Sequence, residues 1–228
     1  MAAAFRWGPF MRSTSPQVKC LFLDIGGVLL TNGWDRHARS RASTNFQIDH
    51  MEMEDRHHLT VDTYEEGRLS LADYLDRVIF YKDRPFTPSQ FRDFMFSQSR
   101  SYPEMIALVG KLKARYDLKT AVVSNEGREL NAHRIREFKL ERIIDFFVCS
   151  CFVHIRKPDA GMFHLALDFA QVEPHEILYL ENTPMFVDIA EALGIRSILH
   201  TDYTSTCARL ADFGLQRGDE VVPDKGSR

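Results

Sequence analysis

The sequence predicts an α/β protein, in which a parallel β-sheet is covered by helices on both faces and a small all-helical domain is inserted after the first strand. Five short apolar runs alternate with amphipathic helical patterns, which is typical of a sheet built from crossover units. Each run is apolar almost throughout, as expected of strands that are buried on both faces. The long stretch between the first and second runs contains helical patterns and no strand pattern, which predicts the insertion.

The predicted strands span residues 18–23, 120–123, 143–148, 177–180 and 195–199. Amphipathic patterns fill the intervals between them. One such pattern places Leu108 and Leu112 on a single helix face before the second strand, and another does the same with Val187 and Ala190 before the fifth. Gly194 follows that last helix, where a glycine commonly ends a helix in the left-handed conformation. The chain therefore alternates between strand and helix along most of its length.

The insertion is predicted to span residues 32–100. Its clearest helical pattern places five apolar side chains on one face, namely Leu71, Tyr74, Leu75, Val78 and Ile79. Loops of this length without secondary structure are uncommon in compact domains. We therefore expect residues 1–31 and 101–228 to form the core domain and residues 32–100 to form a helical cap over the strand ends. We expect residues 1–17 and 215–228 to be disordered tails.

Composition gives no support for a nucleic-acid or membrane partner. The chain has 228 residues and a net charge of -3, from 29 basic and 32 acidic residues, so no strong field of either sign is expected. No apolar run approaches the roughly 20 residues that a bilayer crossing needs. The first residues contain no continuous apolar segment, so a secretory signal is not expected. The pattern gives no basis for an oligomeric state.

Cysteine usage points to a reducing compartment. Four cysteines are too few for a disulfide framework in a chain of this length. We expect them to be buried structural thiols, because free cysteine is commonly buried. They are Cys20, Cys149, Cys151 and Cys207. With the missing secretory signal, this predicts a cytoplasmic protein.

Polar residues follow four of the predicted strands. In open parallel sheets, ligands bind outside the carboxyl ends of the strands, so these side chains are expected to lie close together. A carboxylate, a hydroxyl, an amine and a second carboxylate would meet there. The residues are Asp24 after the first strand, Ser124 and Asn125 after the second, Lys157 on the loop after the third, and Glu181 and Asn182 after the fourth.

These motifs, in this order and at these spacings, resemble the haloacid dehalogenase (HAD) superfamily of aspartate-nucleophile hydrolases, most of which are phosphatases. The resemblance extends from about residue 18 to residue 213 and includes the point at which a helical cap is inserted. Residues 64–70 (YEEGRLS) also resemble a recurrent phrase of such caps. The resemblance implies a Rossmann-like core and a magnesium-dependent phosphatase, with the cap selecting a small phosphorylated metabolite.

The resemblance also implies a role for each residue of the site. Asp24 would attack phosphorus and carry an aspartyl-phosphate, which divides a difficult hydrolysis into two steps. Gly26 and Gly27 would let the backbone approach the phosphate closely. The Ser124 hydroxyl would donate to the phosphoryl oxygens, and Asn125 would hold the loop. Lys157 would neutralise the charge that develops in the transition state.

A magnesium ion is the cofactor that the resemblance implies. It would lie between the Asp24 carboxylate, the carbonyl oxygen of Gly26 and an oxygen of the fourth motif, supplied by Glu181 or Asn182. The family usually has two adjacent acids in that motif. A hard cation prefers charged oxygen ligands, so the neutral amide of Asn182 predicts weaker magnesium binding.

Gly26 is a second departure from the family pattern. The family usually has a second aspartate at this position, which protonates the leaving group and activates water. Losing such a group typically costs about 10²- to 10⁴-fold in rate, and least for acyl or aryl phosphates. Glu65, Glu66 and Glu126 are candidate replacements, and the sequence does not decide among them.

Two alternative functions stay open. In a 2-haloacid dehalogenase Asp24 would attack carbon without a metal, but such enzymes carry an aspartate near the position of Phe186, whereas this chain has Asp188 two residues later. A catalytically weak relative with a binding or regulatory role is favoured by Gly26 and Asn182. The retention of Asp24 with its partner residues argues against that reading.

The basic residues of the cap leave the substrate open. Arg36, Arg39, Arg41 and Arg68 could each contact an anionic substrate. A solvated helix face explains each of them equally well.

Overall fold

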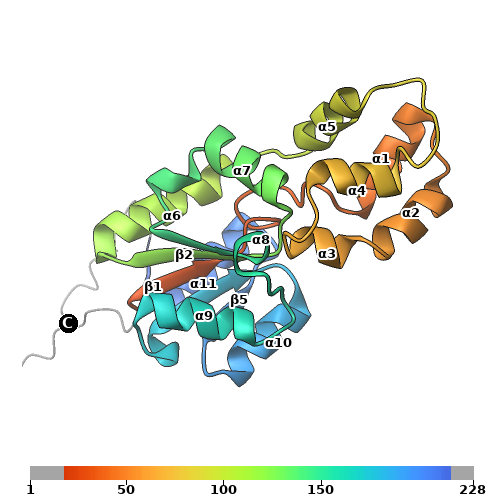
Figure 1. Cartoon of the computed structure of the whole chain (residues 1–228). Helices are drawn as coiled ribbons and strands as arrows, with labels where there is room; N and C mark the ends of the chain where they lie inside the picture. The colour runs from red at the N-terminus through yellow and green to blue at the C-terminus, as the bar shows by residue number, and fades with distance from the viewer. Residues whose placement is uncertain (1–17, 217–228) are drawn as a thin grey trace, which may run out of the picture.

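The computed structural model of the protein describes residues 18–216, which contain a five-stranded parallel sheet with helices on both faces (Figure 1). The strand order is β3-β2-β1-β4-β5. This arrangement confirms the predicted fold class. The strands are β1 (Cys20–Leu23), β2 (Lys119–Ser124), β3 (Phe146–Cys149), β4 (Ile177–Glu181) and β5 (Arg196–Leu199).

Helices of the core pack on the two faces of the sheet. Alternate side chains of β1 explain why its sequence is apolar throughout: Leu21 and Leu23 pack in the cluster with α6 and α11, while Phe22 packs in the cluster with α9 and α10. The core helices are α6 (Pro103–Tyr116), α7 (Arg128–Glu137), α8 (Ser150–Val153), α9 (Gly161–Ala170), α10 (Pro184–Ala192) and α11 (Tyr203–Asp212), with short 3₁₀ turns η1 (Leu140–Arg142) and η2 (Pro174–Glu176). No helix within residues 18–216 combines the length and apolar character that a bilayer crossing requires.

The third strand was predicted to begin too early. Residues 143 and 144 belong to the turn around η1, where the backbone N–H groups of Ile143 and Ile144 both donate to Leu140 O at 3.0 Å. Their side chains are apolar because this turn packs on the core; Ile144 is 4% exposed. Periodicity does not separate a buried turn from the strand that follows it.

Two other predictions concern the ends of the chain and the cysteines. Leu215 is buried, so the ordered chain extends beyond the predicted start of the C-terminal tail. Residues 1–17 and 217–228 lie outside the described residues. Cys20, Cys149 and Cys151 are buried free thiols, as predicted, whereas Cys207 is half-buried.

The segment between β1 and α6 forms a helical body at one end of the core (Figure 1). Its helices pack around their own apolar cluster, in which Phe46 and Phe91 have ring centroids 4.9 Å apart. All of its regular elements between residues 36 and 97 are helices. They are α1 (Arg36–Phe46), α2 (His50–His58), α3 (Val61–Glu65), α4 (Leu71–Val78) and α5 (Pro88–Ser97).

Local sequence signals set where these helices begin. The Asp35 carboxylate accepts from the N–H of Ala38 at the start of α1. Ser70 and Asp73 form a reciprocal capping box at the start of α4. These caps satisfy backbone donors that a helix cannot satisfy itself. The cap helices are therefore specified locally as well as by their shared core.

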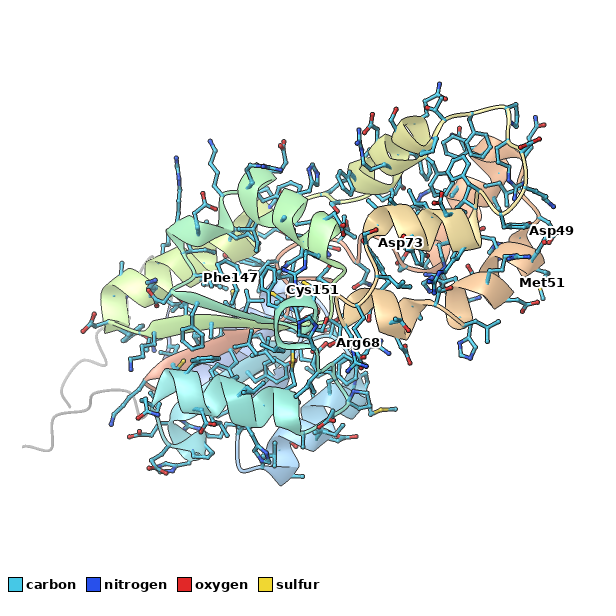
Figure 2. All side chains as sticks on the ribbon, viewed as in Figure 1. Asp49, Met51, Arg68, Asp73, Phe147 and Cys151 are labelled. Atoms are coloured by element: carbon cyan, nitrogen blue, oxygen red, sulfur yellow. The ribbon has the colours of Figure 1, made fainter. Side chains whose placement is uncertain are left out.

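Close backbone contacts join the cap to the core. Arg68 and Cys151 lie at this junction (Figure 2). Gly67, which has a φ of +66°, packs so closely that an added Cβ would lie 2.3 Å from the carbonyl oxygen of Cys151. At a neighbouring contact the Tyr64 ring fills the space that a Cβ on Gly127 would need. Glycine at both positions lets the segment around α3 lie directly on the core.

We predict that Gly67→Ala destabilises the protein more than Gly194→Ala does. Both residues have positive φ angles, +66° and +81°, so both alanines incur left-handed backbone strain of about 1–2 kcal/mol. Only Gly67 also meets a carbonyl oxygen, whereas a Cβ on Gly194 has its nearest neighbour at 3.7 Å. Urea unfolding of the two variants measures the difference. Equal free energies of unfolding would show that the Cys151 contact is not tight.

Candidate active site

The structure brings the polar residues at the strand ends into one cavity. Asp24 follows β1, Ser124 ends β2, Glu181 ends β4, and Lys157 lies on the loop after α8. A cavity of about 210 Å³ lies between these ends and the cap. Among the residues named from the sequence, its lining contains the site residues Asp24, Gly26, Ser124, Asn125, Lys157 and Asn182, the acid–base candidates Glu65 and Glu126, and Phe186, whereas Gly27 and Glu181 lie outside it.

Lys157 is the centre of this cluster. Its ammonium nitrogen lies 3.0 Å from Asp24 Oδ1, 2.6 Å from Glu181 Oε2 and 2.9 Å from the hydroxyl of Tyr179. An ammonium group has three donors, so all of them are used. Tyr179 accepts from Lys157 and in turn donates to Glu181 Oε2. Lys157 is 1% exposed, so these bonds form away from water.

Burial and neighbouring charges control the ionisation of the cluster. Burial opposes charge on Lys157, but the carboxylates of Asp24 and Glu181 hold its pKa above the usual value. Burial raises the pKa of Asp24, which Lys157 opposes and Glu181 reinforces, while a hydrogen bond with Ser124 lowers it. Two carboxylates thus share one ammonium. A further cation would offset the remaining negative charge.

Asn125 fixes the loop that carries Lys157. Its amide nitrogen donates to the carbonyl oxygen of Lys157 at 2.8 Å, and its amide oxygen accepts from the N–H of Lys157, also at 2.8 Å. This paired contact holds the backbone of residue 157 against the end of β2. Asn125 therefore sets the position from which the Lys157 side chain reaches the carboxylates.

The oxygens proposed for magnesium lie around the Asn182 amide. One atom of the Asn182 amide lies 3.0 Å from Glu181 Oε1 and 3.1 Å from the carbonyl oxygen of Gly26. If that atom is nitrogen, it donates to both oxygens. If it is oxygen, it faces two other oxygens, an arrangement that would be favourable only with a cation shared between them.

The donor set therefore fits a hard cation in one orientation of the Asn182 amide, with Glu181 as the weakest donor because its Oε1 already accepts from the N–H groups of Asn182 and Thr183 at 2.9 Å. Asp24 supplies a carboxylate beside it, and its Oδ2 would lie 3.8 Å from a Cβ on Gly26. Within residues 18–216 no cluster of three or more histidine, cysteine, aspartate or glutamate side chains offers a metal site. The candidate site instead combines carboxylates with a carbonyl and an amide, a donor set typical of magnesium.

Gly27 is required next to this amide. It has a φ of +76°, and a Cβ there would lie 2.1 Å from the Asn182 side chain. The space beside Gly26 is also filled, because a Cβ on Gly26 would lie 3.1 Å from Asn32 Oδ1. Asn32 thus occupies the side-chain space at the position where the family usually has an aspartate. No sequence pattern identified Asn32.

Glu126 and Arg134 form a buried ion pair beside the cavity. Burial raises the pKa of Glu126 to about 7, and Arg134 opposes that shift. Arg134 also donates to the carbonyl oxygen of Thr31 and has no exposed surface. The pair therefore anchors the chain entering the cap to the loop that follows Ser124.

The arginines named from the sequence do not line this cavity. Arg39 binds Glu54 within the cap, with Nε 2.6 Å from Oε1, and Arg41 binds Gln98. Arg68 pairs with Glu66 at 3.3 Å, and Arg36 is exposed. None of these four arginines, which the sequence left open as either substrate contacts or solvated residues, lies in the cavity lining.

The arginine that lines the cavity is Arg156, next to Lys157. Its Nη2 lies 2.7 Å from Glu65 Oε2, and its Nη1 pairs with Asp62. Arg156 therefore joins the core loop to the end of α3. Arg156 was not singled out from the sequence.

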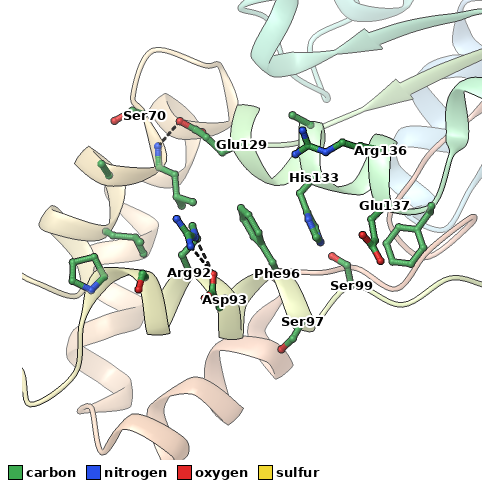
Figure 3. Close-up of a pocket in the computed structure, with 17 residues that line it drawn as sticks. Ser70, Arg92, Asp93, Phe96, Ser97, Ser99, Glu129, His133, Arg136 and Glu137 are labelled. Carbon is green, nitrogen blue, oxygen red and sulfur yellow. Dashed lines mark hydrogen bonds and ion pairs between the residues drawn. The ribbon is translucent and has the colours of Figure 1, made fainter.

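A larger groove of about 1140 Å³ lies between α4 and α5 of the cap and α7 of the core (Figure 3). Phe96 stacks on His133 in it, with ring centroids 4.6 Å apart. Glu129 accepts from the N–H of Leu71 at 3.0 Å across the groove. None of its lining residues lines the cavity around Asp24.

We predict that Asn182→Asp strengthens magnesium binding. Without metal, the new carboxylate faces Glu181 and the Gly26 carbonyl, so the variant should unfold at a lower temperature than the wild type. With magnesium its stabilisation should exceed that of the wild type, with a dissociation constant at least about tenfold lower, or ~1.4 kcal/mol.

Thermal unfolding with magnesium chloride, against sodium chloride at matched ionic strength, measures the effect of this substitution. Equal magnesium-dependent shifts for both proteins would contradict the assigned role of Asn182.

Comparison with known proteins is consistent with this geometry. Residues 18–194 match the family model of the haloacid dehalogenase-like hydrolases. The chain therefore belongs to that family, as the four motifs predicted. A HAD family enzyme of Bacteroides thetaiotaomicron, crystallised with magnesium and inorganic phosphate, has a TM-score of 0.68 and 19% identity, with 83% of this chain and 98% of that chain covered. This similarity shows the fold.

Two curated relatives match shorter regions. A haloacid dehalogenase-like hydrolase domain-containing protein 3 of Xenopus laevis is 40% identical over 63 residues, or 28% of this chain and 25% of the relative. An (S)-2-haloacid dehalogenase 1 of a Pseudomonas species is 25% identical over 103 residues, or 45% of each chain. The matches thus span less than half the length of these relatives.

Proposed function

We propose that the protein is a magnesium-dependent phosphatase that hydrolyses a small phosphorylated metabolite through an aspartyl-phosphate on Asp24. The observation that carries the proposal is the buried contact of Asp24 with Lys157, beside Ser124, in a polar cavity under the cap. A carboxylate nucleophile next to an ammonium and a hydroxyl suits an electrophile with anionic oxygens.

Each residue of the site has its own role in phosphoryl transfer. Asp24 supplies the attacking oxygen, Ser124 donates to the phosphoryl oxygens, and the positive charge of Lys157 offsets the charge that develops on them. Asn125 keeps Lys157 in place through its two bonds to the loop. A magnesium ion bound by Asp24, Gly26 O, Glu181 and Asn182 would neutralise charge on the phosphoryl group. Catalysis of this kind depends mainly on positioning and charge.

The size of the cavity limits the substrate. Its volume of about 210 Å³ is below the roughly 300–1,000 Å³ of typical ligand pockets. A phosphoryl group with a small substituent suits this space. The cavity lies between the cap and the strand ends, so a movement of the cap would change access to it.

Dehalogenation has less support. Phe186 lines the cavity, and its ring centroid lies 4.8 Å from Lys157 Nζ. Asp188 is exposed and is absent from the lining, so it does not provide the carboxylate that the dehalogenase pattern needs near residue 186. The similarity to the Pseudomonas dehalogenase covers 45% of the chain and does not change this balance.

We predict that wild-type protein hydrolyses para-nitrophenyl phosphate and acetyl phosphate only with magnesium, and that Asp24→Asn abolishes both activities. The amide of asparagine is a poor nucleophile, so no aspartyl-phosphate forms. Phosphate release measures turnover, and Asp188→Asn serves as a control because Asp188 lies outside the cavity. Equal inactivity of the wild type and Asp24→Asn would favour a binding or regulatory protein.

A further inference from the structure

The phosphatase reaction, on which this inference rests, needs a proton for the leaving oxygen and a base for water. Gly26 supplies neither. Asn32 fills the adjacent space, but its amide does not exchange a proton near neutral pH. The proton carrier must therefore come from elsewhere in the cavity lining.

Besides Asp24, two carboxylates line the cavity, those of Glu65 and Glu126. They differ in how unfavourable it would be to protonate them. Glu126 pairs with Arg134, whose side chain is completely buried. A proton on Glu126 would leave that guanidinium without its counter-charge, and an unpaired buried charge is strongly unfavourable. Although burial raises the pKa of Glu126 to about 7, each protonation would break this buried ion pair, so Glu126 is the less suitable of the two carboxylates to exchange a proton in each cycle.

The ion-pair partner of Glu65 is Arg156, which also pairs with Asp62. Arg156 contacts Glu65 through Nη2 and Asp62 through Nη1, so Asp62 keeps Arg156 paired when Glu65 takes up a proton. Burial also raises the pKa of Glu65, an effect that Arg156 and Lys157 oppose and Asp62 reinforces. Its side chain is 22% exposed and lines the cavity, although Oε2, the oxygen that contacts Arg156, is buried.

The backbone around Glu65 is held against the core. The Ser150 hydroxyl donates to the carbonyl oxygen of Glu65 at 2.7 Å, and His154 Nδ1 donates to that of Glu66 at 2.7 Å. Glu65 comes from α3 of the cap, whereas Asp24 lies at the end of β1. In an in-line displacement the leaving oxygen departs on the side opposite the nucleophile. That side of the cavity faces the cap.

We propose that Glu65 is the general acid and base of the reaction, replacing the carboxyl group that is missing at position 26. As the Asp24 oxygen bonds to phosphorus, the bond from phosphorus to the leaving oxygen breaks and that oxygen takes the proton of Glu65. Water then attacks phosphorus and gives a proton to Glu65. The bond between Asp24 and phosphorus breaks, which releases inorganic phosphate and restores both side chains.

The experiment compares Glu65→Gln with Glu66→Gln, a neighbour that lies outside the cavity, on three substrates. Phenyl phosphate and para-nitrophenyl phosphate differ little in shape, but phenolate is the stronger base and needs a proton more. Acetyl phosphate needs none. The Glu65→Asp variant keeps a carboxyl group and therefore tests whether that group is needed. Thermal unfolding shows whether each variant is folded.

We expect Glu65→Gln to lose about 10²- to 10⁴-fold in kcat/KM on phenyl phosphate and much less on para-nitrophenyl phosphate. On acetyl phosphate it should release one equivalent of acetate per protein rapidly and then turn over slowly, because water is no longer activated. Glu65→Asp should recover part of the loss, and Glu66→Gln should behave as wild type.

Equal losses on all three substrates without a burst, or a Glu65→Gln variant that matches Glu66→Gln, would overturn the role of Glu65. Wild-type protein that is inert on all three substrates would instead remove the proposed phosphatase function, and this inference with it.

Discussion

The site depends on one buried ammonium group. Lys157 bonds to Asp24, Glu181 and Tyr179, which come from the ends of β1 and β4, while its own backbone is bonded to Asn125 after β2. An ammonium with almost no exposed surface is stable only if its charge is compensated and its donors are satisfied. The strand ends must therefore stay in register for Lys157 to remain buried.

This requirement links the fold to the chemistry. The parallel order β2-β1-β4 places the three strand ends side by side, and the sheet keeps them there through its backbone pairing. Burial raises the pKa of Asp24, and Glu181, which the same bonds to Lys157 hold nearby, adds to that rise. Charge is thus concentrated where a phosphoryl group and a cation would bind.

The cap completes the site from the other side. Tight contacts at Gly67 and Gly127 bring the end of α3 onto the core. Glu65 reaches the cavity because of those contacts, and Arg156 pairs with it across the boundary. A cap that moved as a body would carry Glu65 with it, so chemistry would be linked to closure.

Sequence reasoning reached the fold and the strand-end residues because both follow local rules. Buried parallel strands are nearly continuous apolar runs, and their carboxyl ends are where polar side chains gather. Asp24, Ser124 and Lys157 were found in this way. The error in the third strand arose from Ile143 and Ile144, which are apolar for packing in a turn.

The residues that sequence reasoning missed depend on contacts between distant segments. Tyr179 lies in an apolar run, so the sequence predicts only that it is a buried residue of a core strand. Nothing in the sequence shows that its hydroxyl reaches Lys157. Asn32 fills the space beside Gly26 only because the chain turns back there. The sequence left the cap arginines undecided for the same reason, since the partners of Arg39 and Arg41 within or beside the cap follow only from the fold.

The most direct test of phosphoryl transfer through Asp24 is to look for the aspartyl-phosphate itself. Wild-type protein is mixed with acetyl phosphate and magnesium, quenched in acid within the first turnover, digested and analysed by mass spectrometry. If Asp24 is the nucleophile, a phosphoryl group is expected on Asp24 and on no other residue. Hydrolysis of acetyl phosphate with no phosphoryl group on Asp24 at any quench time, or with the group on a different residue, would contradict it.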